Sequence, residues 1–370
     1  MSAKAVERLR LAAAPLTLIA VWLIFTNHGP FSSTEVNDLY VYGQYAQQLA
    51  DGLIPYKDFD FEYPPLALIP IGVLGDHVIA FSLATLSAAL VCQECARRIT
   101  GEKAAWAMAA LPLLAGAQVR THFDLFVIAL VMLALVSRRS SGLLLGAAAA
   151  MKLWPGLVAA AILRDRRSWT EFAIVTVPLA LVTLALGGWV MVKFHVQRPI
   201  QIESTPSSVL SLLPVDVSTT GAPITNDRFK SNGTASDWAG VVGALFVVLE
   251  LVAIAWFVWR GQRNAVLAAL GVTLAFVALG KVLSPQFMLW LFPLAVAAWG
   301  WPAVFVALAT ALTQVEFPTR YFDLVFRHHD MLLVVGVRNM LLIAALLATA
   351  RALARSSPPS AAPSTAPAPR

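Results

Sequence analysis

Long apolar runs separated by short polar turns dominate the pattern of this 370-residue chain. An apolar run of about 18 or more residues is long enough to cross a bilayer as a helix. The pattern predicts about ten membrane-crossing helices, over residues 11–26, 78–95, 104–119, 124–136, 172–192, 238–259, 265–279, 287–299, 303–315 and 331–349. We therefore expect an all-α, polytopic membrane protein with a single integral membrane domain over residues 1–355.

Residues 142–163 depart from this pattern. The run is long enough to cross, but Lys152 and Pro155 interrupt it, and arginines precede and follow it. Because arginine and lysine gather in cytoplasmic loops, both of its ends are expected on the cytoplasmic side. We predict a re-entrant pair of half-helices, since broken backbone at membrane depth is tolerated only where it is buried or lines a cavity.

The distribution of charge predicts one orientation in the membrane. Basic residues concentrate near the N-terminus and in alternate turns, whereas most carboxylates fall in the other turns. The positive-inside rule then places both termini in the cytoplasm. Polar outer loops are expected over residues 27–65, 193–237 and 316–330, and the Pro-, Ala- and Ser-rich residues 356–370 are expected to form a disordered cytoplasmic tail.

The composition agrees with a membrane protein. Hydrophobic residues make up 58% of the chain and charged residues 13%, whereas soluble domains average about 25% charged residues. Basic cytoplasmic loops account for the net charge of +6, so no nucleic-acid partner is expected.

The outer loop over residues 27–65 concentrates acidic residues and tyrosines. Residues 36–49 have helical spacing, Asp51 and Gly52 end this helix, and Pro64-Pro65 impose an extended backbone. We expect the helix to lie at the outer membrane interface. The carboxylates of the loop are Glu35, Asp38, Asp51, Asp58, Asp60 and Glu62.

These acids, together with cations on the same side, indicate a chemistry. A carboxylate can act as general base on a hydroxyl, and cations can stabilise a phosphate leaving group. A single base suits an inverting displacement of a sugar from a lipid phosphate, whereas two flanking carboxylates would suit a hydrolase. Asp38, at the head of the predicted helix, is the candidate base; a helix cap or a solvated loop acid is the structural alternative.

Cations outside the cytoplasmic turns are costly near a membrane and are therefore functional candidates. A structural role stays open for them: Arg120 would anchor a turn, and Lys152 would be a snorkelling or paired lysine. Because the re-entrant pair starts from the cytoplasm, Lys152 reaches the outer site only if the pair penetrates deeply. The candidate phosphate ligands are Arg120, Lys152, Arg198 and Arg320, and the candidate sugar ligands are Gln201, Glu203 and Gln286.

One motif of the outer loop is distinctive. Residues 52–59 (GLIPYKDF) and 62–65 (EYPP) follow Asp38, and this arrangement resembles the first outer loop of glycosyltransferase family 87, in the GT-C superfamily of membrane glycosyltransferases. That family includes actinobacterial polyprenyl-phosphate-mannose-dependent mannosyltransferases and an arabinofuranosyltransferase. Further similar stretches follow in order, at residues 120–124 (RTHFD), 152–155 (KLWP), 198–204 (RPIQIES) and 283–290 (LSPQFMLW).

The resemblance implies a GT-C-like bundle in which Asp38 is the catalytic base and a polyprenyl-phospho-sugar is the donor. Mannose is the sugar expected, and the acceptor would be a glycolipid or a cell-envelope glycan at the outer face of a bacterial plasma membrane. No cofactor is assigned, and the sequence leaves a divalent metal open without indicating one. The residues expected to contact the sugar or the acceptor in the outer loop are Tyr40, Tyr45, Asp58, Glu62 and Tyr63.

A transporter or lipid flippase for a glycan or lipid-linked precursor is the alternative. Such proteins share the many spans, the broken helix and the cations near the membrane. Many are built from inverted repeats with matching broken segments in both halves. This sequence has one clear broken segment, at residues 142–163, and no evident repeat, which favours the transferase.

Overall fold

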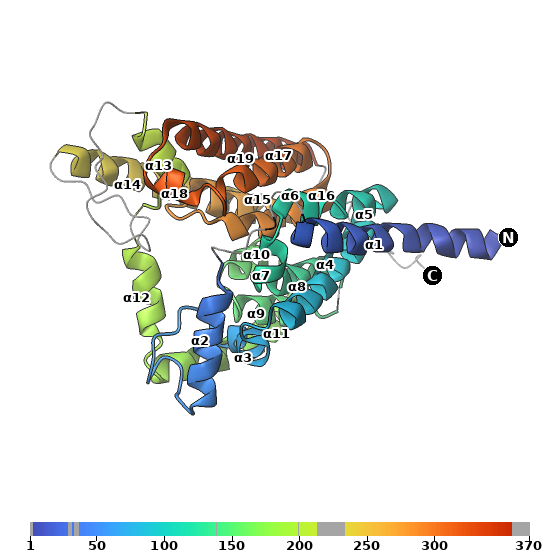
Figure 1. Cartoon of the computed structure of the whole chain (residues 1–370), viewed down its shortest axis with the longest axis horizontal. Coiled ribbons are helices and arrows are strands. Elements are labelled where there is room, and N and C mark those ends of the chain that lie inside the picture. The colour runs from blue at the N-terminus through green and yellow to red at the C-terminus, as the bar shows by residue number, and fades with distance from the viewer. Residues whose placement is uncertain are drawn as a thin grey trace, which may run out of the picture.

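The computed structural model describes residues 3–28, 32, 37–137, 139–198, 200–212 and 234–356. Within these residues the chain is built from helices and has no β-strand, which confirms the predicted all-α class (Figure 1). Glu35, residues 199 and 213–233 of the predicted outer loop over residues 193–237, and nearly all of the predicted tail lie outside the described residues.

Nineteen α-helices follow one another along the described part of the chain. Short 3-10 turns lie at Pro65–Ala67, Gly261–Arg263 and Pro285–Phe287. The α-helices are α1 (Ala3–His28), α2 (Leu39–Ala50), α3 (Leu68–Leu74), α4 (Val78–Thr100), α5 (Glu102–Met108), α6 (Leu111–Ala115), α7 (Gln118–Thr121), α8 (Asp124–Val136), α9 (Ser141–Ala149), α10 (Pro155–Ile162), α11 (Arg166–Ala185), α12 (Trp189–Gln197), α13 (Thr205–Leu210), α14 (Thr234–Arg260), α15 (Ala265–Leu279), α16 (Met288–Ala298), α17 (Trp301–Glu316), α18 (Tyr321–Val325) and α19 (His329–Arg355).

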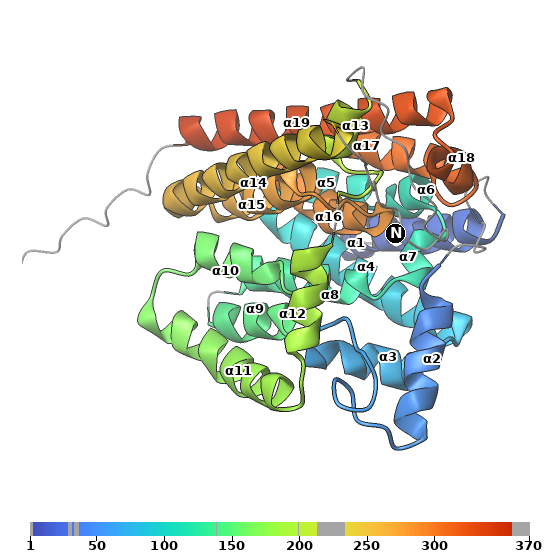
Figure 2. The same ribbon diagram turned by 90° about the vertical axis from the view of Figure 1, so that its left-hand side faces the viewer.

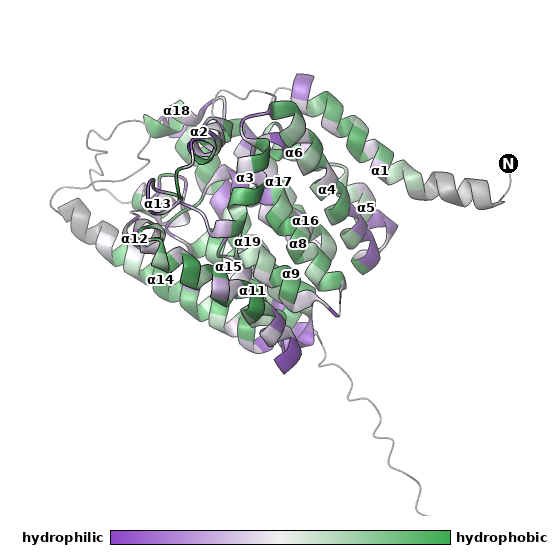
Figure 3. Ribbon diagram, turned by 90° about the horizontal axis from the view of Figure 1, so that it is seen from below, coloured by the Kyte–Doolittle hydropathy of each residue, from purple (hydrophilic) through white to green (hydrophobic). Residues whose placement is uncertain are grey.

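Four helical segments of the described chain have the length and apolar composition needed to cross a bilayer: Val78–Thr100, Arg166–Ala185, Gly240–Arg263 and His329–Arg355. Further apolar helices of 10–17 residues accompany them. Figure 3 shows hydrophobic residues over most of the helices and hydrophilic ones gathered mainly at helix ends and connections. These features indicate a membrane protein, while the count of about ten crossings stays a prediction. The shorter apolar helices are Ala12–His28, Pro65–Leu74, Asp124–Val136, Ala265–Leu279, Pro285–Ala298 and Trp301–Glu316.

The break predicted within residues 142–163 is present. α9 ends at Ala149 and α10 begins at Pro155, where the missing N–H of proline is tolerated because the first turn of a helix leaves its N–H groups unbonded. α9 packs closely on α11 through Gly142 and Gly146, since a Cβ on Gly142 would lie 2.0 Å from the Ser168 carbonyl oxygen. Small residues four apart permit this approach of two backbones. The side from which the pair enters the membrane stays a prediction.

Two predicted spans are wrong in their extent. Residues 104–119 are not one helix, because the chain breaks into α5, α6 and α7, with Gly116 at a φ of +55° between the last two. The span predicted at residues 172–192 begins earlier, at Arg166, and ends at Ala185. Gly187, at a φ of +94°, turns the chain there, and α12 starts separately at Trp189. Glycine adopts such positive φ values without the steric cost that other residues bear.

The helices form two groups in space. In Figures 1 and 2, α13, α14, α15, α17 and α19 lie together on one side, and α2, α3, α9, α11 and α12 lie on the other. α15 is the most enclosed helix of the first group, with almost all of its side chains buried. α2 packs on α3 and buries Leu39, Tyr42 and Tyr45. Its position at the membrane interface stays a prediction.

A buried polar network ties the segment before α13 to α17 and α19. The Arg338 guanidinium, fully buried in α19, donates to the Glu203 carbonyl oxygen and lies 3.5 Å from Glu316 Oε2. Asn339 Nδ2 donates to the same carbonyl at 3.1 Å and to Ser208 Oγ at 2.8 Å. Several simultaneous hydrogen-bond and ion-pair partners thus offset the cost of burying the Arg338 charge in an apolar helix.

Replacement of Arg338 by methionine is expected to lower the free energy of unfolding by about 3–5 kcal/mol, because a buried ion pair loses one partner. Thermal unfolding of the purified protein in detergent measures this loss. Arg351→Met on the exposed face of the same helix is the matched control, expected to change stability by less than about 0.5 kcal/mol. Equal unfolding midpoints for the two variants would show that the network contributes no stability.

Candidate functional site

Asp38 lies directly before α2, as predicted, and its carboxylate faces two polar side chains. Tyr42 Oη donates to Asp38 Oδ2 at 3.3 Å, and His122 Nε2 lies 3.5 Å from the same oxygen. The Asp38 side chain is 32% exposed, whereas His122 is 2% exposed. The helix-cap alternative is wrong, because the Asp38 side chain makes no capping hydrogen bond and Asn37 Oδ1 instead accepts from the Leu39 N–H at 2.8 Å.

Behind Asp38 lies an aromatic cluster, formed by the rings of Tyr42, Tyr63, Phe81 and Phe123. The Tyr63 and Phe123 ring centroids are 5.0 Å apart, and Tyr42 lies 5.7 Å from Phe123 and 5.7 Å from Phe81. Burial, and then the nearby Asp38 carboxylate, raise the pKa of Tyr42 well above its usual value. Tyr42 therefore stays protonated and remains a hydrogen-bond donor to Asp38.

Lys152 approaches the same cluster from the bend between α9 and α10. Its Nζ lies 2.5 Å from Asp124 Oδ1 and 4.9 Å and 5.7 Å from the ring centroids of Phe123 and Tyr63. An ammonium over aromatic faces is stabilised by the ring quadrupoles, more so where water is excluded. Lys152 thus contacts Tyr63 of the loop that carries Asp38, a contact that the sequence left undecided.

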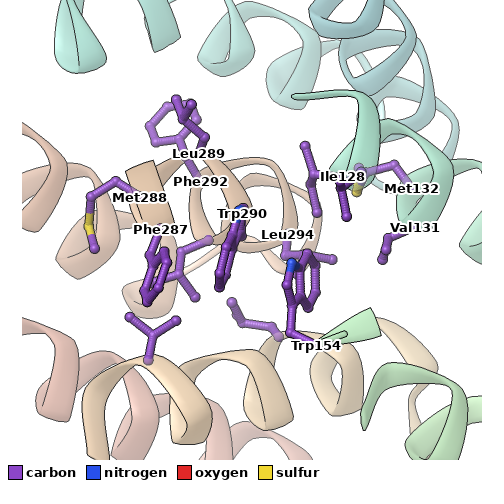
Figure 4. Close-up of a cluster of buried hydrophobic side chains, with 14 of the residues drawn as sticks. Ile128, Val131, Met132, Trp154, Phe287, Met288, Leu289, Trp290, Phe292 and Leu294 are labelled. Atoms are coloured by element: carbon purple, nitrogen blue, oxygen red, sulfur yellow. The ribbon is translucent and has the colours of Figure 1, made fainter. Parts of the chain in front are cut away.

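The indole of Trp290 completes the surroundings of Lys152. Trp290 Nε1 donates to Asp124 Oδ1, and Lys152 Nζ lies 5.1 Å from the Trp290 ring centroid. Figure 4 shows Trp290 between Phe287 and Trp154, and their ring centroids are 4.0 Å and 5.0 Å from that of Trp290. This stacked row fixes the indole that orients Asp124.

Four of the five stretches that carried the family resemblance therefore meet at one place. The outer loop supplies Asp38 and Tyr63, residues 120–124 supply His122 and Asp124, residues 152–155 supply Lys152, and residues 283–290 supply Trp290. A backbone hydrogen bond from Leu66 N to Ala150 O, 2.8 Å long, joins the loop to the bend directly. We take this convergence as the candidate active site.

Glu62 and Arg198 are neighbours at the edge of this site. The Glu62 side chain reaches solvent, but neighbouring protein atoms exclude part of the water around its carboxyl group. This partial desolvation raises the pKa of Glu62, and the positive charge of Arg198 opposes the rise. Arg198 thus lies within electrostatic reach of the outer loop, as its candidacy as a phosphate ligand requires. It belongs to the connection that follows α12.

The other candidate residues of the outer loop differ in exposure. Tyr40 is 72% exposed, whereas Tyr45 is buried and packs on Phe59 and Phe61. Asp58 Oδ2 accepts from the Ile54 N–H at 2.8 Å and so closes the turn of the loop. Their contacts with a sugar or acceptor stay predictions.

Arg120 lies on α7, on the same turn as His122, and holds the end of α1. Its Nη1 donates to Asn27 Oδ1 at 2.7 Å, which is the anchoring role left open by the sequence. Only Thr121 separates Arg120 from His122 in the chain, and phosphate binding by Arg120 stays a prediction beside the anchoring contact.

The remaining candidates make contacts elsewhere. Gln201 Nε2 donates to Glu203 Oε2 at 3.0 Å inside the buried network around Arg338, and Gln286 Oε1 accepts from Ser284 Oγ at 2.6 Å. Arg320 pairs with Asp323 at 2.8 Å and Asp330 at 2.6 Å, and Figures 1 and 2 place α18, the helix that follows Arg320, apart from α2. Their proposed ligand roles stay predictions.

Three residues of the site were not assigned roles from the sequence: His122, Asp124 and Trp290. The first two lie within the polar turn at residues 120–124, and an aspartate at the start of an apolar helix was the available signal. Its partner, Lys152, is 28 positions away in the chain, so only the fold could pair them. Among the described residues, no group of three or more His, Cys, Asp or Glu side chains is arranged to hold a metal ion.

Comparison with known proteins identifies the family. Residues 61–285 match the family model of glycosyltransferase family 87, and the match includes Tyr63, His122, Asp124 and Lys152. No curated protein and no solved structure matches the chain. Because the matched residues make up more than half of the chain, the protein belongs to glycosyltransferase family 87 and is a membrane glycosyltransferase.

Proposed function

We propose that this protein moves a sugar, with mannose expected, from a polyprenyl-phosphate donor to a glycolipid or cell-envelope glycan at the outer face of a bacterial plasma membrane. One observation carries the proposal. The partly exposed carboxylate of Asp38 and the ammonium of Lys152 lie on one aromatic cluster, joined through Tyr42 and Tyr63. A base and a cation in one small site are what the displacement of a sugar from a phosphate needs.

An inverting reaction fits the carboxylates of this site. Asp38 is accessible, so an acceptor hydroxyl can approach it and give up its proton while attacking the anomeric carbon. Asp124 is fully buried and bonded to Lys152 and Trp290, so it is unsuited to act as a second, nucleophilic carboxylate. A retaining or hydrolytic mechanism would need two carboxylates that flank the scissile bond.

Lys152 and Arg198 are the cations that support phosphate binding. The Asp124 carboxylate compensates much of the charge of Lys152. The Lys152 ammonium still has N–H groups besides the one bonded to Asp124, and its side chain is 13% exposed. Arg198, which follows α12, lies within electrostatic reach of Glu62 in the loop over residues 27–65. A phosphate between them would gain charge-assisted hydrogen bonds that strengthen as negative charge develops on the leaving group.

The transporter or flippase alternative rests on the number of apolar helices, the broken segment α9–α10 and the cations near the membrane. The family match and the base beside a cation favour transfer chemistry instead.

The deciding experiment incubates the purified protein with a radiolabelled glycolipid acceptor and three donors: polyprenyl-phospho-mannose, polyprenyl-phospho-arabinose and nucleotide-activated mannose. We expect a labelled product of higher mass with the first donor. Product from the arabinose donor alone would change the sugar, and product from the nucleotide donor would overturn the lipid-phosphate assignment. Movement of a labelled lipid across reconstituted vesicles without any new product would favour a flippase.

A further inference from the structure

The hydrogen bonds around His122 determine which ring nitrogen carries its proton. His122 Nδ1 lies 3.2 Å from the Gln118 carbonyl oxygen, which can only accept, and 3.0 Å from Thr121 Oγ1. The Thr121 hydroxyl donates its single proton to the Ala117 carbonyl oxygen at 3.2 Å, so it offers a lone pair to the ring. Both neighbours of Nδ1 are acceptors, and Nδ1 therefore carries a proton.

The other ring nitrogen, Nε2, then meets Asp38. In neutral His122 the proton on Nδ1 leaves Nε2 as a lone pair, and this lone pair points at Asp38 Oδ2 across 3.5 Å. A carboxylate and an imidazole lone pair attract each other only if one proton lies between them. The geometry is thus arranged to hold a single additional proton.

We propose that Asp38 and His122 form a proton-holding dyad, in which His122 takes over the proton that Asp38 removes from the acceptor. The inference deepens the proposed function and rests on Asp38 being its base. The acceptor O–H bond breaks, the proton goes to Asp38, and the freed oxygen forms a bond to the anomeric carbon as the sugar–phosphate bond breaks. The proton then passes from Asp38 to His122 Nε2, which restores the Asp38 carboxylate beside an imidazolium. His122 is a positioning residue, because it acts through Asp38.

The groups that surround His122 are consistent with one transient positive charge. The outer loop and α2 contribute Asp38, Tyr42 and Tyr63, and the start of α8 contributes Asp124, already paired with the cation Lys152. α6 carries no charged residue, and α4 presents Phe81 to this end of the site while its charged residues lie in its last two turns. On α7 itself, Arg120 donates to Asn27 of α1, and Asp38 is the carboxylate that lies 3.5 Å from the His122 ring.

The first test is the pH dependence of transfer in His122→Gln. The wild-type dyad works only while it can still accept a proton. Activity is therefore lost as the pH falls and the dyad becomes fully protonated. Because an imidazole holds a proton to higher pH than a carboxyl does, the acidic limb of the rate profile is expected to move to lower pH in the variant, by about one pH unit or more. Turnover at the optimum is expected to fall, but by less than the minimum of about 10²-fold expected on losing the base itself.

His77→Gln is the matched control, because His77 is an exposed histidine at the start of α4, on the neighbouring element. It is expected to leave the profile unchanged. A purely structural role for His122 would lower the rate of His122→Gln without moving the acidic limb, and that result would overturn the dyad.

A second readout does not depend on turnover. The ring nitrogen signals of His122, assigned in ¹⁵N-histidine-labelled protein by their loss in His122→Gln, are followed through a pH titration. In Asp38→Asn the midpoint is expected to fall by about one pH unit or more, because the imidazolium loses its counter-charge. An unchanged midpoint would overturn the dyad, whereas absence of transfer from every donor by the wild type would overturn the proposed function alone.

Discussion

Asp38→Asn is expected to reduce sugar transfer by a factor of about 10²–10⁴, the usual contribution of a positioned general base. Asparagine keeps the size of the side chain, and its amide oxygen can still accept the hydrogen bond that Tyr42 donates at 3.3 Å. It cannot take a proton from the acceptor hydroxyl. Initial rates with saturating polyprenyl-phospho-mannose, measured beside donor binding and the unfolding midpoint, separate lost chemistry from lost structure.

Asp51→Asn is the matched control for this change. Asp51 lies at the other end of α2, is exposed, and accepts from Gln47 Nε2 at 2.9 Å. Its replacement is expected to leave transfer close to the wild-type rate. Normal turnover by Asp38→Asn would mean that another group removes the proton, and both the assigned mechanism and the dyad would then be wrong.

Lys152→Met is expected to lower the free energy of unfolding by about 3–5 kcal/mol, since it leaves the Asp124 carboxylate buried without its cation. Asp124 is fully buried, and Lys152 Nζ lies 2.5 Å from its Oδ1. Methionine keeps the apolar length of lysine, so the rings of Phe123, Tyr63 and Trp290 retain a packing partner. Thermal unfolding in detergent measures the loss of stability.

The double variant Lys152→Met/Asp124→Asn distinguishes a structural lysine from a donor-binding one. It removes both charges, while the amide of the introduced asparagine keeps an oxygen for the Trp290 N–H, so most of the lost stability is expected to return. Transfer is expected to stay low, because the phosphate has lost a cation. Recovery of transfer together with stability would show that Lys152 only holds the fold.

The elements of the fold were largely predictable because their signals are local. The helix at residues 36–49 corresponds to α2, and the break at Lys152 and Pro155 corresponds to the α9–α10 bend, since apolar periodicity and proline act within a few residues. The span predicted at residues 104–119 failed because the helix breaks twice, at Ala109-Ala110 ahead of Pro112 and again at Gly116. A single proline or glycine in an apolar run signals a break only weakly.

The sequence by itself determined that this protein is helical and membrane-embedded, with an acidic loop in which Asp38 heads a helix. Composition, apolar run length and turn residues carry that information directly. Only the tertiary structure decided which residues accompany Asp38. The pairs Asp38–His122 and Asp124–Lys152, and the row containing Trp290, join segments far apart in the chain. A buried charge must find its partner wherever packing brings one, and sequence distance does not limit that choice.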